Sequence, residues 1–396
     1  MPFRDNRPGP RGAESAGGST GTVPGDVVTR FLSEGFRYVG RIRLAYEFGP
    51  QPEPAASQPA PEEDGKGNWI AKAVRCTPEG DVYVGSLKVP MKAIKVNSYM
   101  PPWMKSAKPF AALSGNNTLI DFAAAMGLLL AAPDASDDAA AGFAAALAAA
   151  GPAPAPDAAA AAAAAAATAG GRRLLAQARG LKELVGGDDR SDCEQGFPFT
   201  AIGQIQVVDD TGLYICTGTL IAPDKVLTAG HCVWNIKRGA FYLNLNYAPG
   251  RYRDGGRIIN PWGVVPWKSV TVFDSFKKNP STWDVAVVTL QKPLGSLTGY
   301  MGIAAGCGRN LQLTVAGYPQ DKAQGTCMMA TCAQRALDCD SPTNEHNCDT
   351  MSGMSGSPLW DGKNRVRLIH VAGIEGREEN RATTLTQFLV NTVARW

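Results

Sequence analysis

The sequence predicts an all-β fold for residues 184–396, either a barrel or a sandwich, ending in a helix. Short runs rich in Val, Ile, Leu, Thr and Tyr alternate there with Gly, Pro, Asn and Asp turns, which is typical of antiparallel all-β domains. The segment is long enough to bury its own core, and its length suits two six-stranded β-barrels. The preceding residues 1–183 differ in composition, being rich in Ala, Gly and Pro.

Six runs are expected to be strands because each is short, apolar and bounded by turn residues. They are Ala201–Val208, Tyr214–Ile221, Lys225–Thr228, Val285–Leu290, Leu311–Gly317 and Arg367–Gly373. In the final segment, Thr384–Trp396, the residues Leu385, Phe388, Leu389 and Val393 recur at helical spacing. Apolar residues three and four apart share one helix face, so this segment is expected to be an amphipathic helix.

Residues 1–183 are predicted to be a largely disordered pro-region. The Ala-rich linker 131–171 contains few side chains large enough to form a core. Residues 31–110 could form a small β-rich module, with strands at Phe36–Phe48 and Asp81–Val89. No catalytic or binding motif is apparent in this half of the chain.

The charge and the histidines argue against several kinds of partner. The formal net charge is only +3 for 396 residues, so neither nucleic acid nor a membrane is expected as a partner. The three histidines, His231, His346 and His370, lack the spacing of metal ligands. No metal site is therefore predicted.

The cysteines predict disulfides and hence a secreted or lumenal protein. Eight of the nine follow Leu184, and such an even set indicates an oxidising compartment. The first residues lack the apolar core of a signal peptide. The most apolar stretch, Phe122–Ala132, is too short to span a bilayer. It is either an Ala-rich helix or, if translation starts near Met104, the core of a signal peptide.

Thr228-Ala-Gly-His231-Cys232 is the first of three strings that place a reactive side chain among apolar or Gly-rich neighbours. Small residues before the histidine allow a tight turn that presents the imidazole to a cleft. Cys216 stands sixteen residues before Cys232, and a disulfide between them would hold the loop that carries His231. His231 is therefore a candidate general base.

The other two strings supply a carboxylate and a hydroxyl. Asp284 precedes the apolar run Val285–Leu290, and Ser355 lies in Gly353-Met-Ser-Gly-Ser-Pro358. The flanking glycines allow a turn that aims the N–H groups of Gly353 and Ser355 at one point, as in an oxyanion hole. A serine nucleophile needs a base and a carboxylate that orients the base. The order His, Asp, Ser is one of those known for such triads.

On these strings, residues 184–396 resemble the chymotrypsin-fold, trypsin-like serine proteases, most closely the glutamyl endopeptidase branch. Leu184–Arg190 is similar to the mature N-terminus of that branch, and Phe197–Ile202 and Ala316–Lys322 add to the likeness. The resemblance implies a double six-stranded antiparallel β-barrel with the active site between the barrels. It implies a serine endopeptidase made as a zymogen, a monomer without a cofactor, with protein or peptide substrates and with protein inhibitors as further partners.

Three residues bear on the side chain recognised before the scissile bond. Asp349 stands six residues before Ser355, where trypsin-like enzymes carry the carboxylate that binds Lys or Arg, and Thr350 follows it as in some glutamyl endopeptidases. His370 stands where glutamyl endopeptidases carry the histidine that receives a Glu carboxylate, a contact that keeps the imidazole cationic. The resemblance favours Glu or Asp. Lys or Arg is the alternative, as is a purely structural His370.

Maturation, the remaining disulfides and turnover are further expectations. Glu183 directly precedes the string similar to a mature N-terminus, so a Glu-specific enzyme could release its own pro-region. Met354 replaces the Asp with which the new N-terminus pairs in the animal enzymes, so that activating ion pair is not expected.

The remaining disulfide pairs are conjectures among fifteen possibilities: Cys193–Cys307, Cys332–Cys348 and Cys327–Cys339. The alternative from another class is a protease-like binding protein without activity.

Overall fold

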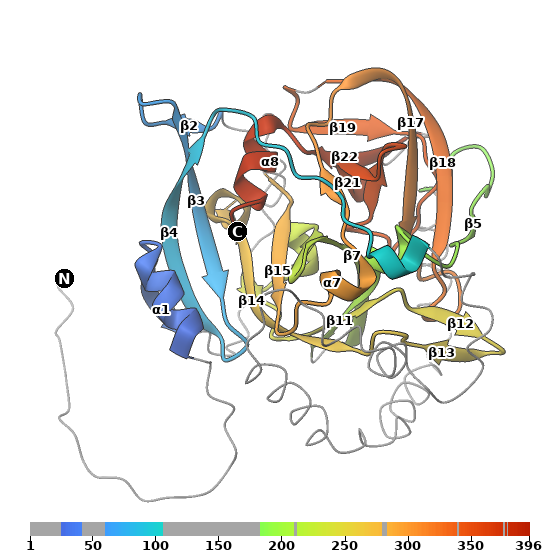
Figure 1. Cartoon of the computed structure of the whole chain (residues 1–396), viewed down its shortest axis with the longest axis horizontal. Helices are drawn as coiled ribbons and strands as arrows, with labels where there is room; N and C mark the ends of the chain where they lie inside the picture. Colours follow the sequence, from blue (N-terminus) through green and yellow to red (C-terminus); the bar gives the residue numbers. More distant parts are fainter. Residues whose placement is uncertain are drawn as a thin grey trace, which may run out of the picture.

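The computed structural model describes residues 25–41, 60–105, 183–209, 212–278, 283–338, 340–374, 377 and 379–396. Within these residues the chain is mostly β, as the sequence predicts, with two large sheets and a few short helices (Figure 1). The Ala-rich linker 131–171 and the apolar stretch Phe122–Ala132 lie outside the described residues. Among the described helices, none has the length and apolar run needed to cross a membrane.

The first sheet closes into a barrel of six antiparallel strands. These are β6 (Ile202–Asp209), β7 (Gly212–Ala222), β8 (Lys225–Thr228), β15 (Ala286–Leu290), β14 (Val265–Phe273) and β11 (Asn244–Pro249). Each pairs with the next, and β11 pairs again with β6. The expected strands of this half coincide with β6, β7, β8 and β15 to within one or two residues. The strands β11 and β14 were not predicted from the sequence.

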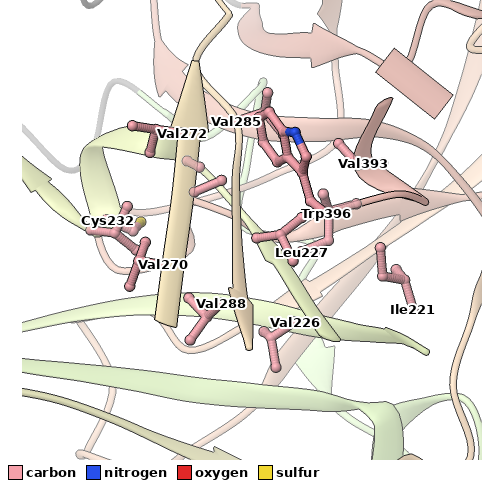
Figure 2. Close-up of a cluster of buried hydrophobic side chains, with 14 of the residues drawn as sticks. Ile221, Val226, Leu227, Cys232, Val270, Val272, Val285, Val288, Val393 and Trp396 are labelled. Atoms are coloured by element: carbon pink, nitrogen blue, oxygen red, sulfur yellow. The ribbon is translucent and has the colours of Figure 1, made fainter. Parts of the chain in front are cut away.

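Apolar side chains fill this barrel and extend to the end of the chain. Val226, Val270 and Val288 share one face of the barrel sheet and Leu227 lies on the other face. All four are buried, and Figure 2 shows them in one cluster with Trp396. The C-terminal helix α8 (Gln387–Val393) covers the barrel, and the hydroxyl of its N-cap, Thr386, accepts a hydrogen bond from the Leu389 amide. The predicted amphipathic helix is therefore present, and it is shorter than the periodic segment.

The second sheet is a half-barrel. Its strands are β19 (Thr343–His346), β22 (Asn380–Thr384), β21 (Arg365–Gly373), β20 (Pro358–Trp360), β17 (Gly308–Gly317), β18 (Met328–Leu337) and β5 (Ser191–Asp192), paired in that order. A short strand β16 (Gly302–Ile303) runs parallel to β21. Within the described residues no strand pair closes this sheet. Asn344 of β19 accepts from the Asp338 amide through Oδ1 and donates from Nδ2 to the Asp338 carbonyl.

Part of the predicted pro-region is folded against the first barrel. Residues 25–41 and 60–105, here called the N-terminal module, contain α1 (Gly25–Ser33), β1 (Arg37–Arg41), β2 (Glu62–Glu63), β3 (Asn68–Cys76), β4 (Asp81–Pro90) and a 3-10 turn, η1 (Pro102–Lys105). Strand β3 pairs with β14, so the barrel sheet continues into the module. The sequence predicts β4 well. It gives no sign that this module adds strands to the barrel sheet.

Shorter elements complete the described structure. They are η4 (Phe199–Ala201), η5 (Gly230–Cys232), β9 (Trp234–Asn235), β10 (Ala240–Phe241), β12 (Tyr252–Asp254), β13 (Arg257–Ile259), α6 (Asp274–Lys278) and α7 (Gly295–Thr298). Three disulfides join Cys193 to Cys327, Cys216 to Cys232 and Cys332 to Cys348. The conjectured pairs Cys193–Cys307 and Cys327–Cys339 are therefore wrong. Strand β5 pairs with β18, and this pairing places Cys193 beside Cys327 and not beside the expected partner, Cys307.

Candidate active site

A cavity of about 560 Å³ brings the three sequence motifs together. Its lining includes Ile215 from β7 of the barrel and Val371 from β21 of the half-barrel, with His231 and Ser355 between them. Asp284 stands behind His231. The volume is in the range of ligand-binding clefts.

His231 and Asp284 form a close pair. The ring Nδ1 of His231 lies 2.8 Å from Asp284 Oδ2, and the His231 amide donates to Asp284 Oδ1 at 3.0 Å. Glycine is needed before the histidine, because a Cβ at Gly230 would lie 3.1 Å from Asp284 Oδ1 and 2.8 Å from the Phe276 ring. The carboxylate therefore holds both the backbone and the ring of His231, with Nε2 as the nitrogen left to face the cavity.

The surroundings of His231 raise its pKa above the ordinary value of 6.5. Burial lowers this pKa, but the negative charge of Asp284 and its hydrogen bond outweigh burial, and the charge of Glu183 adds to their effect. An opposite charge stabilises the imidazolium form. The ring is thus set to accept a proton and to hold it as a cation.

The loop around Ser355 has the backbone conformation that its glycines predict. Gly353 and Gly356 have φ values of +96° and +85°, and a Cβ at Gly353 would lie 2.5 Å from the Tyr318 carbonyl oxygen. The Ser355 carbonyl accepts from the Thr217 amide at 2.8 Å, which anchors the loop to the barrel. Within the described residues, neither the Gly353 nor the Ser355 amide donates to a protein acceptor.

Ser355 and His231 face the same cavity without a hydrogen bond between them in this conformation of the described residues. Such bonds are often long in a free enzyme and tighten when substrate binds. The disulfide Cys216–Cys232 lies beside both residues and lines the cavity. It is the pair that the sequence analysis placed there to hold the histidine loop.

Glu183 occupies the side of the cavity where a recognised side chain was expected. Its Oε2 lies 3.7 Å from Nε2 of His370, and its carbonyl accepts from the Thr350 amide at 3.2 Å and from Asn380 Nδ2 at 2.8 Å. His370 is 1% exposed, and its Nδ1 lies 3.2 Å from Nε2 of His346. Thr350 and His370 therefore both contact Glu183, Thr350 at its backbone carbonyl and His370 at its carboxylate.

Asp349 points elsewhere. Its two carboxylate oxygens accept from the amides of Val185 at 2.7 Å and Asp189 at 2.9 Å. The side chain is buried and, like those of Thr350 and His370, is not among the residues that line the cavity. Both oxygens thus bind the backbone of the segment after Glu183. A substrate Lys or Arg side chain that entered the cavity would therefore not have this carboxylate as a partner.

Sequence reasoning missed several residues that shape the site. His346 stands behind His370, and burial together with the neighbouring imidazole lowers the pKa of His346 well below 6.5, so this ring is neutral near pH 7. Asn380 bridges Glu183 and the Cys348 carbonyl. Trp283, directly before Asp284, has a φ of +53°, a conformation rare for a bulky residue. No local pattern marks these residues, because β22 brings His346 and Asn380 to β21 only through sheet pairing.

The described residues offer one group with the geometry for a metal ion: Cys216, His231 and Cys232. The two sulfurs are joined in a disulfide, whereas a metal needs deprotonated thiolates as ligands. This donor set does not fit a metal centre.

Comparison with known proteins finds similarity to the C-terminal half of the chain. The trypsin family profile matches residues 185–396. A glutamyl endopeptidase of Bacillus licheniformis is 26% identical over 229 residues, covering 54% of this chain and 69% of that protein. A protein of Bacillus subtilis named extracellular metalloprotease is 28% identical over 228 residues, covering 54% of this chain and 69% of that protein. The solved structure of a Glu endopeptidase in complex with MPD aligns with a TM-score of 0.49 and 24% identity, over 54% of this chain and 98% of that one.

Proposed function

Because the chain belongs to the trypsin family through residues 185–396, we propose that it is a serine endopeptidase whose triad is Ser355, His231 and Asp284. Ser355 Oγ attacks the scissile carbonyl while His231 Nε2 takes its proton and then gives it to the leaving amine. Asp284 keeps the His231 ring in the required tautomer and stabilises the imidazolium. The amides of Gly353 and Ser355 receive the oxyanion. The pairing of His231 with Asp284 at 2.8 Å beside the cavity that contains Ser355 is the observation that supports this assignment.

We further propose a preference for Glu, or Asp, before the scissile bond. The supporting observation is the position of Glu183, whose carboxylate lies beside His370 in the cavity that also holds His231 and Ser355. An imidazole N–H can donate to a carboxylate, and the ring offers a basic side chain no negatively charged partner. The engagement of Asp349 with backbone amides disfavours the Lys or Arg alternative.

Three disulfides lie in the protease half, and disulfides persist in oxidising compartments. We therefore propose secretion or a lumenal location, with protein or peptide substrates and no cofactor. Glu183 remains the proposed site of self-cleavage. In this conformation its carbonyl is held by Thr350 and Asn380 rather than by the amides of Gly353 and Ser355, so one molecule is expected to cut another.

Labelling with a fluorophosphonate, followed by a digest of a peptide library, tests activity and preference together. The expected result is a single labelled residue, Ser355, and cleavage after Glu and Asp. A Ser355→Ala chain is the control and should neither label nor cleave. Absence of labelling in the intact chain would favour the binding-protein alternative, and cleavage mainly after Lys or Arg would overturn the proposed preference.

A further inference from the structure

The N-terminal module is built into the sheet of the protease barrel. Strand β3 runs antiparallel to β14, from Ala73 opposite Phe273 to Cys76 opposite Val270. Val270 and its neighbours pair with β15 on their other side, so β14 is a central strand here, as Figure 1 shows. The side chains of Ala73, Val74 and Cys76 are fully buried. Removing β3 would leave an apolar, unpaired strand edge.

Two more contacts attach the module to the C-terminal half. The buried Asn391 of helix α8 donates from Nδ2 to the carbonyls of Pro90 at 2.7 Å and Lys92 at 3.0 Å. Tyr99 and Tyr300 exchange backbone hydrogen bonds of 2.8 and 2.9 Å. Without the module, the Asn391 amide would lose both acceptors, and a buried polar group without partners is costly.

The contact with β14 leads directly to the catalytic pair. Phe273, which pairs with β3, packs its ring against Trp283, the residue before Asp284, with the ring centroids 5.7 Å apart. Phe276 of the next helix, α6, is fully buried and lies against Gly230, the residue before His231. The module therefore supports the segments that position both His231 and Asp284.

From these contacts we propose that the N-terminal module is a permanent part of the enzyme and not a removable pro-region. When the chain is cut between residues 105 and 184, the module stays bound as a separate non-covalent chain. It acts by positioning His231 and Asp284, and it does not touch the substrate.

The test uses the full chain with Glu183→Gln, which removes the proposed self-cleavage site, and with a site for a sequence-specific protease inserted in the Ala-rich linker 131–171. After cutting, both pieces should elute together in native size-exclusion chromatography, and fluorophosphonate labelling should proceed at the uncut rate. Elution of the C-terminal piece alone in native buffer overturns the proposal. Labelling fails in the uncut chain if the proposed function is wrong, whereas co-elution reports on the module independently.

The variant Asn391→Ala tests two roles of the N-terminal module separately, namely its binding to the C-terminal half and its positioning of His231 and Asp284. In the uncut chain the linker keeps the module at high local concentration, so this variant should label at nearly the normal rate. After cutting, the variant should release the module and label at least about tenfold more slowly. Asn347→Ala, at an exposed position, is the matched control and should resemble the unsubstituted chain. Release of the module with unchanged labelling overturns the positioning role.

A second inference rests on the proposed preference for Glu and concerns Glu183. The carboxylate of Glu183 lies beside His370. The rest of the side chain packs against Gly373, where a Cβ would lie 2.7 Å from Glu183 Cγ. Its Oε2 is buried, with no hydrogen-bond partner within the described residues. We infer that Glu183 blocks the recognition pocket of the uncut chain against an acidic substrate until cleavage removes it.

Binding to the inactive Ser355→Ala chain tests this inference without self-cleavage. A fluorescent peptide containing Glu should bind at least about tenfold more tightly when Glu183→Ala is added, because the pocket and His370 become free. Glu194→Ala, at an exposed position, is the control and should leave the affinity unchanged. Equal affinity with and without Glu183 overturns the inference. If the affinity for a Lys peptide rises equally, the inference that Glu183 blocks the pocket is supported, and the proposed preference for Glu is overturned instead.

Discussion

At the residue scale, the contact with Asp284 determines how readily the imidazole of His231 holds a proton. In the proposed mechanism the ring must be neutral to accept a proton from Ser355. Burial lowers the pKa of His231, but the Asp284 carboxylate raises it by more. The protonated form is therefore favoured up to a pH above 6.5, and the active form appears only above that pH.

The pH dependence of kcat/KM should show this shift. Activity is expected to fall as the pH drops through a midpoint above 6.5. Asp284→Asn removes the charge that raises the pKa, so the midpoint should move to lower pH while kcat falls by about 10⁴ through loss of the correct tautomer. A pH–rate profile of both forms provides the measurement. An unchanged midpoint in the variant would contradict the role given to Asp284.

His370 carries the proposed recognition of acidic side chains. His370→Ala should lower kcat/KM for a Glu substrate by roughly 10², because a buried imidazole that can bind the substrate carboxylate is lost. The rate of fluorophosphonate labelling should change little, because that reagent does not need the pocket. A parallel loss of labelling would instead indicate that His370 supports the fold of the site.

At the element scale, the loop that carries Ser355 depends on its glycines. Gly353→Ala places a Cβ against the Tyr318 carbonyl at a φ of +96°, so the amides of the oxyanion hole should be displaced. The expected loss in kcat is about 10²–10³. Gly362→Ala is a suitable control, because that position has open space around it. Equal activity of the two variants would show that the Gly353 amide is not used.

The disulfide Cys216–Cys232 joins strand β7 to the turn η5 that carries His231. A bridge that closes a loop of this length contributes about 3 kcal/mol to the free energy of unfolding. The double variant Cys216→Ser, Cys232→Ser should therefore unfold at lower denaturant concentration, by about that free energy, in equilibrium unfolding followed by tryptophan fluorescence. It should also label more slowly. Unchanged stability would indicate that the loop is held by its packing alone.

At the scale of the whole molecule, the cavity exists because two sheets meet. Strand β7 contributes Cys216, the turn η5 contributes His231, and the loop before β20 contributes Ser355. Neither sheet contains the complete set. The bond from the Thr217 amide to the Ser355 carbonyl joins the barrel to the loop of the half-barrel, so the two sheets are held together directly at Ser355.

The sequence by itself determined the all-β class, most strands of the barrel, and the three short strings around His231, Asp284 and Ser355. These features depend on local rules, namely alternation of apolar residues, turn residues and glycines with positive φ. Only the tertiary structure decided the partner of Cys193, the positions of Asp349 and Glu183, and the insertion of β3 beside β14. Each of these features depends on the pairing or packing of segments that are distant in the sequence. The local composition of a segment does not show which partner it will have.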